Sequence, residues 1–423
     1  MQNRRDFIKN ASVFSAMMAA APTIVSAQGA ARTFKVAMIG SGRRASEAFT
    51  NMAEAAKKMG HAIQLVAAHD FFLEEAKRRC KQFGCDEKFA FGGGDGYFKM
   101  LDVPGIEIVI LGAPPAFRPR HLDACIKAGK HVFAEKPIAV DPQGVRHVLE
   151  CTAAAKAKQL TLVTGTQRRH QGAYMRQALA FQKGQLGTIR GGNIYWCQAR
   201  GSIRPRKEGV TNAQYMCNNW MNWAEMSGDH IVEQHVHNID VANWFIGRYP
   251  RTAMGVGARV RRPTGNQYDF FSVDFDYGEG LHIHSLARQI PGCADRVGEL
   301  FSTELAEISG GGKIRRYDGQ EVKLEDLGNE GNPYVNEHSA LLDSVINGKQ
   351  LNEGETIAYA TAAAVMGRLS AYTGQVVRMS DVLTNKDSPF YTMNFKPAAL
   401  DFEGAADVTL PEEGVAPRPG KDK

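Results

Sequence analysis

The sequence predicts an α/β protein of two domains, in which a doubly wound parallel sheet is followed by an α+β domain with a large, mostly antiparallel open sheet. Residues 33–165 alternate apolar, strand-like stretches with helical stretches, which is the pattern of a parallel sheet covered by helices. Residues 166–395 contain stretches in which apolar and polar side chains alternate, such as 251–260, 269–277 and 281–287. Alternation of this kind is typical of antiparallel strands with one buried face.

Composition argues against several classes of function. The net charge of +6 is modest, and no basic stripe carries interleaved aromatic residues, so no nucleic-acid partner is predicted. The seven cysteines include no Cys-x-x-Cys pair, which argues against a disulfide framework, and we expect them to be small buried residues. Residues 396–423 are rich in Gly, Pro and Glu and are expected to form an extended or disordered tail.

The first 27 residues predict an export signal. Arg4 and Arg5 are followed by Phe-Ile-Lys and a weakly apolar stretch, residues 11–21, which is typical of a twin-arginine (Tat) signal peptide. That stretch is shorter than the roughly twenty residues that a membrane-spanning helix needs. The small residues 25–27 fit a cleavage site. We therefore expect the Tat machinery to export the folded protein to the periplasm or another extracytoplasmic compartment.

A glycine-rich turn follows the first predicted strand. The strand 35–39 runs into a Gly-x-Gly-x-x-Ala turn at residues 40–45. Gly40 permits the tight turn, Gly42 lets backbone N–H groups approach a pyrophosphate, and the small Ala45 lets the next helix pack closely. The turn predicts that the first domain is a dinucleotide-binding Rossmann domain.

The residue that ends the second predicted strand bears on the choice of cofactor. Asp70 stands where the adenosine ribose hydroxyls are bound, and its carboxylate would repel a 2′-phosphate, so NAD is predicted rather than NADP. Arg43 and Arg44 of the glycine turn could instead bind such a phosphate, which leaves NADP as the alternative. Asp70 also fits the N-cap of a following helix over residues 71–83, and the two roles are compatible.

Two further strand ends carry candidate cofactor contacts. The strand 107–112 is followed by Ala-Pro-Pro, which includes Pro114, and the strand 131–134 leads directly into Glu135-Lys136-Pro137. Ligands bind at the carboxyl ends of parallel strands, so these residues are expected beside the cofactor.

The order of these motifs resembles the Gfo/Idh/MocA oxidoreductases. The resemblance rests on the glycine turn, Asp70, the two prolines and the run Ala-Gly-Lys-His-Val-Phe-Ala-Glu-Lys-Pro at residues 128–137, and it covers residues 33–395. It implies that Lys136 reaches the nicotinamide ribose and the reacting hydroxyl, that Glu135 lies against the cofactor, and that the peptide before Pro137 is cis. Relatives often have Thr before the two prolines, whereas this chain has Ala113.

The same resemblance implies a substrate site in the second domain. Gln167 and Arg169 follow the last strand of the parallel sheet and are expected in the cleft, Gln167 toward the cofactor and Arg169 toward the substrate. Glu233 and His237 are spaced to share one side of a single helix. They align with the aspartate and histidine of the family motif Asp-x-Gly-x-His-x-x-Asp, with Glu233 in place of the aspartate. His237 is then the expected general base, and Lys136 would stabilise a developing alkoxide.

Other interpretations of nearby residues remain open. His230, Glu233, His235 and His237 could bind a metal, but His235 and His237 would point to different sides of a helix, so no metal site is predicted. Asp240 is expected to form an inward structural hydrogen bond. Two groups have both a site and a packing interpretation. The aromatic residues Tyr215, Trp220 and Trp223 could form a sugar-stacking wall or core, and His282 and His284 could be cleft residues or sheet residues.

These features predict an NAD-dependent oxidoreductase that acts on a ring hydroxyl of a small-molecule sugar or glycoside, with a 3-keto sugar as the favoured product. An exported enzyme has no soluble nicotinamide pool to draw on, so the cofactor is expected to stay bound and to be recycled. The alternative is an NAD-dependent glycoside hydrolase that uses transient C3 oxidation, elimination and water addition, with Tyr215 or Tyr268 as a second base. A second alternative is a non-catalytic sugar-binding protein. A homo-oligomer through the C-terminal sheet is also expected.

Overall fold

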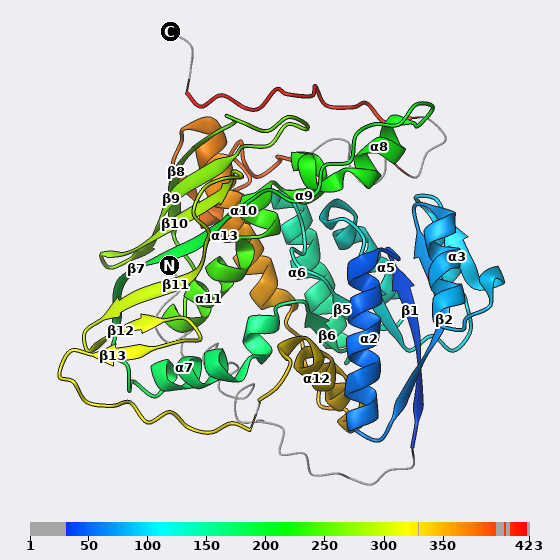
Figure 1. The fold of residues 1–423 in the computed structure, drawn as a ribbon, viewed down its shortest axis with the longest axis horizontal. Coiled ribbons are helices and arrows are strands. Elements are labelled where there is room, and N and C mark those ends of the chain that lie inside the picture. Colours follow the sequence, from blue (N-terminus) through cyan, green and yellow to red (C-terminus); the bar gives the residue numbers. More distant parts are fainter. Residues whose placement is uncertain (1–30, 329, 395–401, 403–406, 421–423) are drawn as a thin grey trace.

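The computed structural model describes residues 31–328, 330–394, 402 and 407–420 of the chain. The predicted export signal, residues 1–27, lies outside the described residues. Two sheets and their helices form two adjoining lobes (Figure 1). Within the described ranges, no helix is long and apolar enough to span a membrane.

The first lobe is built on a six-stranded parallel sheet. Its strand order is β3-β2-β1-β4-β5-β6, so the order reverses between β1 and β4, and this is the point at which such sheets bind ligands. The strands are β1 (Thr33–Ile39), β2 (Ala62–Asp70), β3 (Ala90–Gly92), β4 (Ile108–Leu111), β5 (His131–Ala134) and β6 (Leu162–Thr164). The helices are α2 (Arg43–Lys58), α3 (Leu73–Gln82), α4 (Gly96–Leu101), α5 (Arg118–Lys127) and α6 (Pro142–Ala157).

Small residues let α2 pack closely on the centre of this sheet. A Cβ added to Gly112, just after β4, would lie 2.6 Å from the Cβ of Ala45 in α2. Helix and strand therefore approach closely only because both positions are small, as the Gly-x-Gly-x-x-Ala turn predicted. The strands β1 and β4 are buried on both faces, which accounts for their continuous apolar sequences.

The second lobe is built on an eight-stranded, mostly antiparallel sheet of order β13-β12-β11-β7-β10-β9-β8-β14, in which β7 and β10 are parallel. Together the two sheets confirm the predicted fold class. The strands are β7 (Ile189–Gln198), β8 (Thr252–Ala258), β9 (Phe270–Gly278), β10 (Leu281–Gln289), β11 (Arg296–Thr303), β12 (Ala306–Ser309), β13 (Ile314–Arg316) and β14 (Val377–Arg378). The helices beside it include α7 (Gly172–Gln182), α10 (His230–Glu233), α11 (Val236–Ile246) and α13 (Gly354–Thr373).

One face of the eight-stranded sheet is open to solvent. Along β10 the side chains alternate strictly, with Leu281 and Ile283 buried and His282 and His284 exposed. His282 pairs with Asp274 at 2.8 Å, and His284 hydrogen-bonds Ser272 at 3.0 Å, both across to β9. The structure therefore supports the sheet interpretation of these two histidines and places them on the open face.

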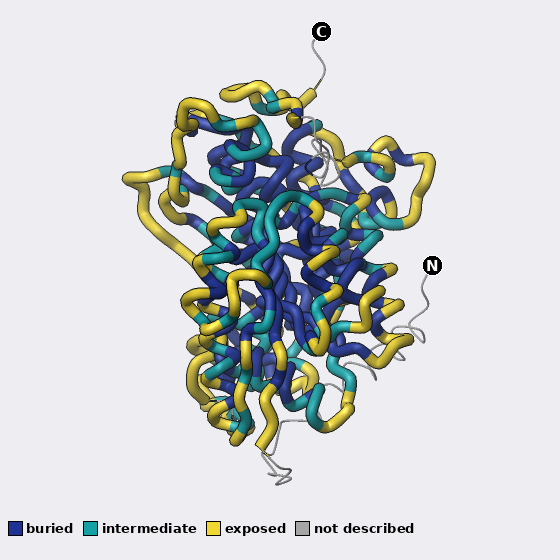
Figure 2. Tube along the Cα trace, turned by 90° about the vertical axis from the view of Figure 1, so that its right-hand side faces the viewer, coloured by how far each residue is buried: buried dark blue, intermediate teal, exposed yellow. Residues whose placement is uncertain are grey.

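Two late helices join the lobes. Helix α12 (Pro333–Asn347) contacts α2 of the first lobe, and α13 lies between α6 and β8. In the view of Figure 2, buried chain fills the interior, and exposed segments are confined to loops and outer edges. Because α13 contacts both α6 of the first lobe and β8 of the second, the lobes share a packed boundary.

The C-terminal segment is extended and docked rather than free. Asp407 accepts hydrogen bonds from the backbone N–H groups of Asn212 and Ala213, at the start of helix α8 (Asn212–Asn218). Further along, the N–H of Gly420 donates to the carbonyl oxygen of Thr373 at 3.2 Å. Residues 407–420 contain no helix or strand and are held to the second lobe by these hydrogen bonds.

Candidate active site

The glycine turn has the geometry of an anion site. Gly40 has φ +81°, and an added Cβ would lie 2.2 Å from the backbone nitrogen of Ala113, so only glycine fits there. An added Cβ on Gly42 would have no atom within 4 Å, so space is open in front of this residue. Helix α2 begins at Arg43, and its first N–H groups have no intrahelical partner. These residues fit the pyrophosphate of a dinucleotide.

Asp70 closes the turn from the end of β2. Its carboxylate accepts hydrogen bonds from the backbone N–H groups of Ser41 at 2.8 Å and Phe72 at 2.9 Å. Burial raises the pKa of Asp70 to about 6. The expected N-cap role is wrong, because α3 begins at Leu73 with Phe72 at its N-cap position, and Asp70 instead bonds the N–H two residues ahead.

The two arginines of the turn have different surroundings. The Arg43 side chain is 91% exposed and lies 3.7 Å from Glu47. The Nε of Arg44 donates to Glu135 at 2.6 Å, and its guanidinium also lies 3.5 Å from the buried Glu337. Arg44 is therefore engaged by two carboxylates, Glu135 at the end of β5 and Glu337 in α12, which leaves Arg43 as the turn's arginine available to a 2′-phosphate.

Glu135 is tightly enclosed. Its side chain is buried beside Arg44, and an added Cβ on Gly165 would lie 2.4 Å from its Oε2. Pro114 and Gln167, the other predicted cofactor contacts, are partly buried at the ends of β4 and β6. All these side chains follow carboxyl ends of parallel strands, where a cofactor is expected.

Lys136 connects the two lobes. The Lys136–Pro137 peptide is cis, as the family resemblance implied. The Lys136 Nζ donates to the backbone oxygen of Glu233 at 2.6 Å and lies 3.3 Å from its Oε1. Only 12% of the Lys136 side chain and 10% of the Glu233 side chain is exposed. A strand end of the first lobe and a helix end of the second therefore meet at one ammonium group.

Glu233 and His237 do not share one helix, which corrects the expectation from their spacing. Helix α10 ends at Glu233 and α11 begins at Val236. Between them, the N–H of His235 bonds the oxygen of His230, five residues back. The His235 ring bonds Asn238 nearby in the chain at 3.2 Å and Ser285 of β10 at 2.7 Å. The bond to Ser285 is a tertiary contact that favours the interrupted conformation over the local helical preference.

His237 is buried next to Lys136. Burial lowers its pKa well below the usual value, and the positive charges of Lys136 and Arg168 lower it further. The imidazole is therefore neutral at physiological pH. Its ring is stacked on Trp196 with centroids 5.7 Å apart and planes 24° apart. A neutral imidazole beside an ammonium group can take up a proton while the ammonium stabilises the oxygen left behind.

Arg169 is committed to a structural ion pair. Its guanidinium binds both carboxylate oxygens of Asp240, at 2.7 and 2.8 Å, and lies 4.9 Å from the centre of the Trp244 ring. Asp240 is buried, in agreement with the expected structural role. The contact of Arg169 with a substrate stays a prediction.

Three residues near the site escaped sequence reasoning. Arg168 lies between Glu299, which its NH1 contacts at 2.6 Å, and the Trp196 ring. The buried Arg118 bonds the carbonyl oxygens of Ala113 and Pro137, so it ties together the loops that carry Pro114 and Lys136. The signal for Trp196 was its place on a strand two residues after the buried Ile194. Nothing in the sequence marks Arg118.

The alternative site residues are packed or committed elsewhere. Trp223 is fully buried in an apolar cluster with Tyr215 and Trp220 packed against it, which supports the core interpretation. The hydroxyls of Tyr215 and Tyr268 bond Glu413 and the oxygen of Pro417 in the C-terminal segment.

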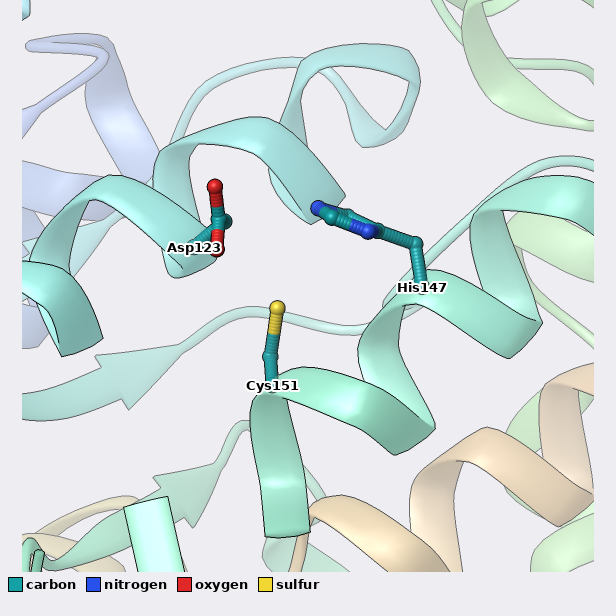
Figure 3. Close-up of side chains that lie close together, drawn as sticks. All are labelled: Asp123, His147 and Cys151. Atoms are coloured by element: carbon teal, nitrogen blue, oxygen red, sulfur yellow. The ribbon is translucent and has the colours of Figure 1, made fainter. Parts of the chain in front are cut away.

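Two of the histidines considered for a metal are packed inside the second lobe. His235 is held by Ser285 and Asn238, and His230 packs edge-to-face on Phe271. Among the described residues, the one group with metal-ligand atoms within 4.8 Å of one another is Asp123, His147 and Cys151 on α5 and α6 (Figure 3). Asp123 already pairs with Lys127 at 2.7 Å, and burial raises the pKa of Cys151 to about 12, so the thiol is protonated.

Both lobes match models of one protein family. Residues 34–165 match "Oxidoreductase family, NAD-binding Rossmann fold", and residues 174–290 match "GFO/IDH/MocA C-terminal domain". These matches cover the glycine turn, Lys136 and His237, so the cofactor domain is one that binds NAD(P).

Curated relatives and solved structures agree with this assignment. Inositol 2-dehydrogenase of Rhizobium meliloti is 24% identical over 50% of this chain and 56% of its own length. A dTDP-3,4-didehydro-2,6-dideoxy-alpha-D-glucose 3-reductase of Actinomadura kijaniata is 27% identical over 40% of this chain and 45% of its own length. The chain thus spans about half the length of these curated relatives.

The solved structures show the same fold across both lobes. Aldose-aldose oxidoreductase from Caulobacter crescentus has a TM-score of 0.64 at 17% identity, with 82% of this chain and 100% of that chain covered. For myo-inositol 2-dehydrogenase from Lactobacillus plantarum the TM-score is 0.63 at 18% identity, with 82% and 99% covered. With both lobes matched, this chain belongs to the Gfo/Idh/MocA family of NAD(P)-binding oxidoreductases.

Proposed function

We propose that this protein is an NAD-dependent oxidoreductase that acts on a ring hydroxyl of a sugar or glycoside and keeps its cofactor bound between turnovers. The observation that carries the proposal is the meeting of Lys136 with Glu233, with a neutral His237 close to the same ammonium group. The names of the relatives support the substrate class, since they describe enzymes of inositols, aldoses and a nucleotide-linked sugar.

Each of the three side chains has a defined role in this proposal. His237 takes the proton of the substrate hydroxyl, and Lys136 donates a hydrogen bond to the oxygen as negative charge develops there. Glu233 holds the Lys136 ammonium through its backbone oxygen and its carboxylate. When bound, the nicotinamide accepts the hydride from the adjacent carbon.

A neutral His237 can act in both halves of a recycling reaction. Burial and the neighbouring cations lower its pKa, so the free imidazole is unprotonated and can accept the hydroxyl proton, while the Lys136 ammonium offsets its weaker basicity by stabilising the oxygen. The protonated imidazole then returns that proton to the oxygen of the carbonyl that is reduced in the second half. The same residue can therefore serve both halves of a recycling reaction.

The preference for NAD over NADP rests on the surroundings of Asp70. Its carboxylate stands at the end of β2 beside the glycine turn, where it would repel a 2′-phosphate. Arg44, which could offset that repulsion, is engaged by Glu135 and Glu337. One exposed arginine, Arg43, is left to bind the phosphate.

An aromatic cluster near the ends of β2 and β4, where the adenosine is expected, supports retention of the cofactor. We call Phe71, Phe117, Met216 and Phe402 the adenosine-side cluster, since Phe71 follows Asp70 and Phe117 follows the loop after β4. Phe402 of the C-terminal segment lies edge-on to Phe117 and Phe71, with centroids 5.0 and 6.1 Å apart. Helix α8 is fastened to the same segment by Asp407. These contacts enclose the region where an adenosine would leave.

Export and self-association belong to the same proposal. The twin arginines at positions 4 and 5 support Tat export to an extracytoplasmic compartment, where recycling of the cofactor would be needed. The open face of the eight-stranded sheet exposes Met254 and Val256 of β8 and Leu300 of β11, which supports a homo-oligomer through this face.

The surroundings of Tyr215 and Tyr268 favour the oxidoreductase over the glycoside hydrolase. The hydrolase needs a second base for the C2 proton, and both hydroxyls are bonded to the C-terminal segment. Burial also raises the pKa of Tyr268 to about 12.

Purified full-length protein, without added nucleotide, tests the proposal. It is incubated with nitrophenyl glycosides, and separately with D-glucose or myo-inositol plus a second sugar as acceptor. A keto-sugar formed only with an acceptor, with NAD co-purifying, is the expected result. Nitrophenol release without net NADH would instead support the hydrolase. Neither product, and no bound nucleotide, would contradict both catalytic functions.

A further inference from the structure

We propose that Trp196 is the platform on which the substrate ring lies, and that it sets the specificity of this site for cyclic polyols. The inference rests on the proposed function and adds a substrate contact that neither the family motif nor the sequence spacing indicates. It starts from the stacking of the Trp196 ring on His237, the predicted base.

Trp196 is fixed in place on three sides. It lies near the end of β7, and its Nε1 donates to Oε1 of Gln198 at 3.1 Å. The guanidinium carbon of Arg168 lies 5.6 Å from the ring centre, while NH1 of Arg168 is held by Glu299. The ring nevertheless remains partly exposed. A partly exposed aromatic surface beside the base is thus available to a ligand.

The other tryptophans of the chain differ from it. Trp223 is fully buried, and Trp244 is buried beneath Arg169. Trp220 packs with α8 in an apolar cluster. Among the described residues, Trp196 is the tryptophan whose ring contacts His237.

The chemistry of a cyclic polyol matches this surface. A sugar or inositol ring presents an apolar C–H face and a rim of hydroxyls, and an aromatic side chain binds such a face through apolar area. Arg168 uses one nitrogen for Glu299, and its remaining N–H groups are donors for hydroxyl oxygens at the rim. A ring lying on Trp196 would present a rim hydroxyl to His237. A short acyclic polyol has no such face to bind.

The test compares Trp196→Phe and Trp196→Ala with the control Trp220→Phe in full-length protein that carries its nucleotide. Binding of D-glucose, myo-inositol and glycerol is followed by intrinsic fluorescence and by calorimetry. We expect Trp196→Ala to weaken the binding of the two cyclic compounds by about tenfold or more, which corresponds to about 1.4 kcal/mol. Trp196→Phe should lose less, and the control and glycerol binding should be unchanged.

Kinetics separate a platform from a purely structural residue. In Trp196→Ala we expect KM for the cyclic substrate to rise more than kcat falls, with bound nucleotide and thermal midpoint preserved. Equal binding of the cyclic compounds by wild type and Trp196→Ala would overturn the inference. A wild type that turns over no substrate and still binds cyclic compounds more tightly than Trp196→Ala does would contradict the proposed function. That result would nevertheless support the role of Trp196 in binding the ring.

Discussion

The Lys136 ammonium lies 2.6 Å from the backbone oxygen of Glu233 and 3.3 Å from the carboxylate of the same residue. The shorter contact is made by the main chain at the end of α10. The position of the lysine therefore depends on where this helix ends as well as on the Glu233 side chain. This contact fixes the position of the two lobes relative to each other at the proposed active site.

The contact between Lys136 and Glu233 predicts that substitutions of these two residues lower kcat to different extents. Lys136→Ala removes the donor that stabilises a developing alkoxide, and we expect kcat to fall by about a hundredfold or more. Glu233→Gln keeps the backbone oxygen, so the fall should be about tenfold or less. Steady-state kinetics measures kcat for both variants, and the amount of NAD that each variant retains is measured in parallel. The exposed Lys81→Ala is the matched control, and full activity in Lys136→Ala would remove this residue from the site.

Most of the fold could be predicted, because the signals for it are local. A continuous apolar run predicted strand β1, glycine spacing predicted the turn, and one acidic residue marked the end of β2. The Glu135-Lys136-Pro137 run placed its charged pair at the end of β5 for the same reason.

The second half of the site was harder, because long-range contacts override local preference there. The spacing of Glu233 and His237 favoured one helix, but Ser285 on β10 holds His235 and breaks it. Strand spacing puts Trp196 on the same face of β7 as Ile194 but does not reveal that it stacks on His237. The pairing of Arg168 with Glu299 likewise leaves no trace in sequence spacing.

Asp70 predicts a pH-dependent choice of cofactor. Its pKa, raised by burial to about 6, leaves the carboxylate charged at pH 8 and largely neutral at pH 5. Repulsion of a 2′-phosphate should therefore weaken on acidification, and the ratio of the NADP to the NAD dissociation constant should fall. Calorimetry at the two pH values measures that ratio. Asp70→Asn should show a low ratio at both, and a ratio equally high at both pH values in wild type would contradict the prediction.

Buried histidines predict loss of stability in acid. Burial lowers the pKa of His338 to about 3, whereas an unfolded histidine titrates near 6.5. The unfolded chain thus binds the extra proton first, so stability is complete above about pH 6.5 and falls as the pH drops toward the folded value. In His338→Leu the unfolding free energy should fall less steeply as the pH drops below about 6.5. The difference in slope from wild type should be at most about 1.4 kcal/mol per pH unit. Urea titrations between pH 7 and 4 measure the slope.

A matched histidine on the open sheet face serves as the control for that slope. His282 is exposed beside Asp274, so His282→Leu is the matched control for replacing a histidine by leucine outside the core. Equal slopes for wild type and His338→Leu would show that His338 binds protons alike in the folded and the unfolded chain, which would contradict the prediction.

The adenosine-side cluster predicts how the cofactor is retained. Phe402→Ala removes the ring that lies on Phe71 and Phe117, and Asp407→Ala removes the carboxylate that fastens the segment to α8. Phe402→Ala should speed nucleotide release by about tenfold, because truncation of a packed aromatic side chain costs about 1.5–3 kcal/mol. Asp407→Ala should speed it by less, because the hydrogen bonds of Asp407 to α8 are exposed to solvent. With NAD supplied in excess, kcat should be unchanged, since neither residue touches Lys136 or His237.

Nucleotide remaining after gel filtration, and its release rate followed by fluorescence, measure this effect. Val415→Ala, an exposed position in the same segment, is the matched control and should keep the nucleotide as wild type does. Faster release in Phe402→Ala together with normal kcat would separate cofactor retention from the chemical step. Unchanged release in both variants would mean that the C-terminal segment only packs against the sheet, and the reason for a recycled cofactor would then have to lie in the nicotinamide half of the site.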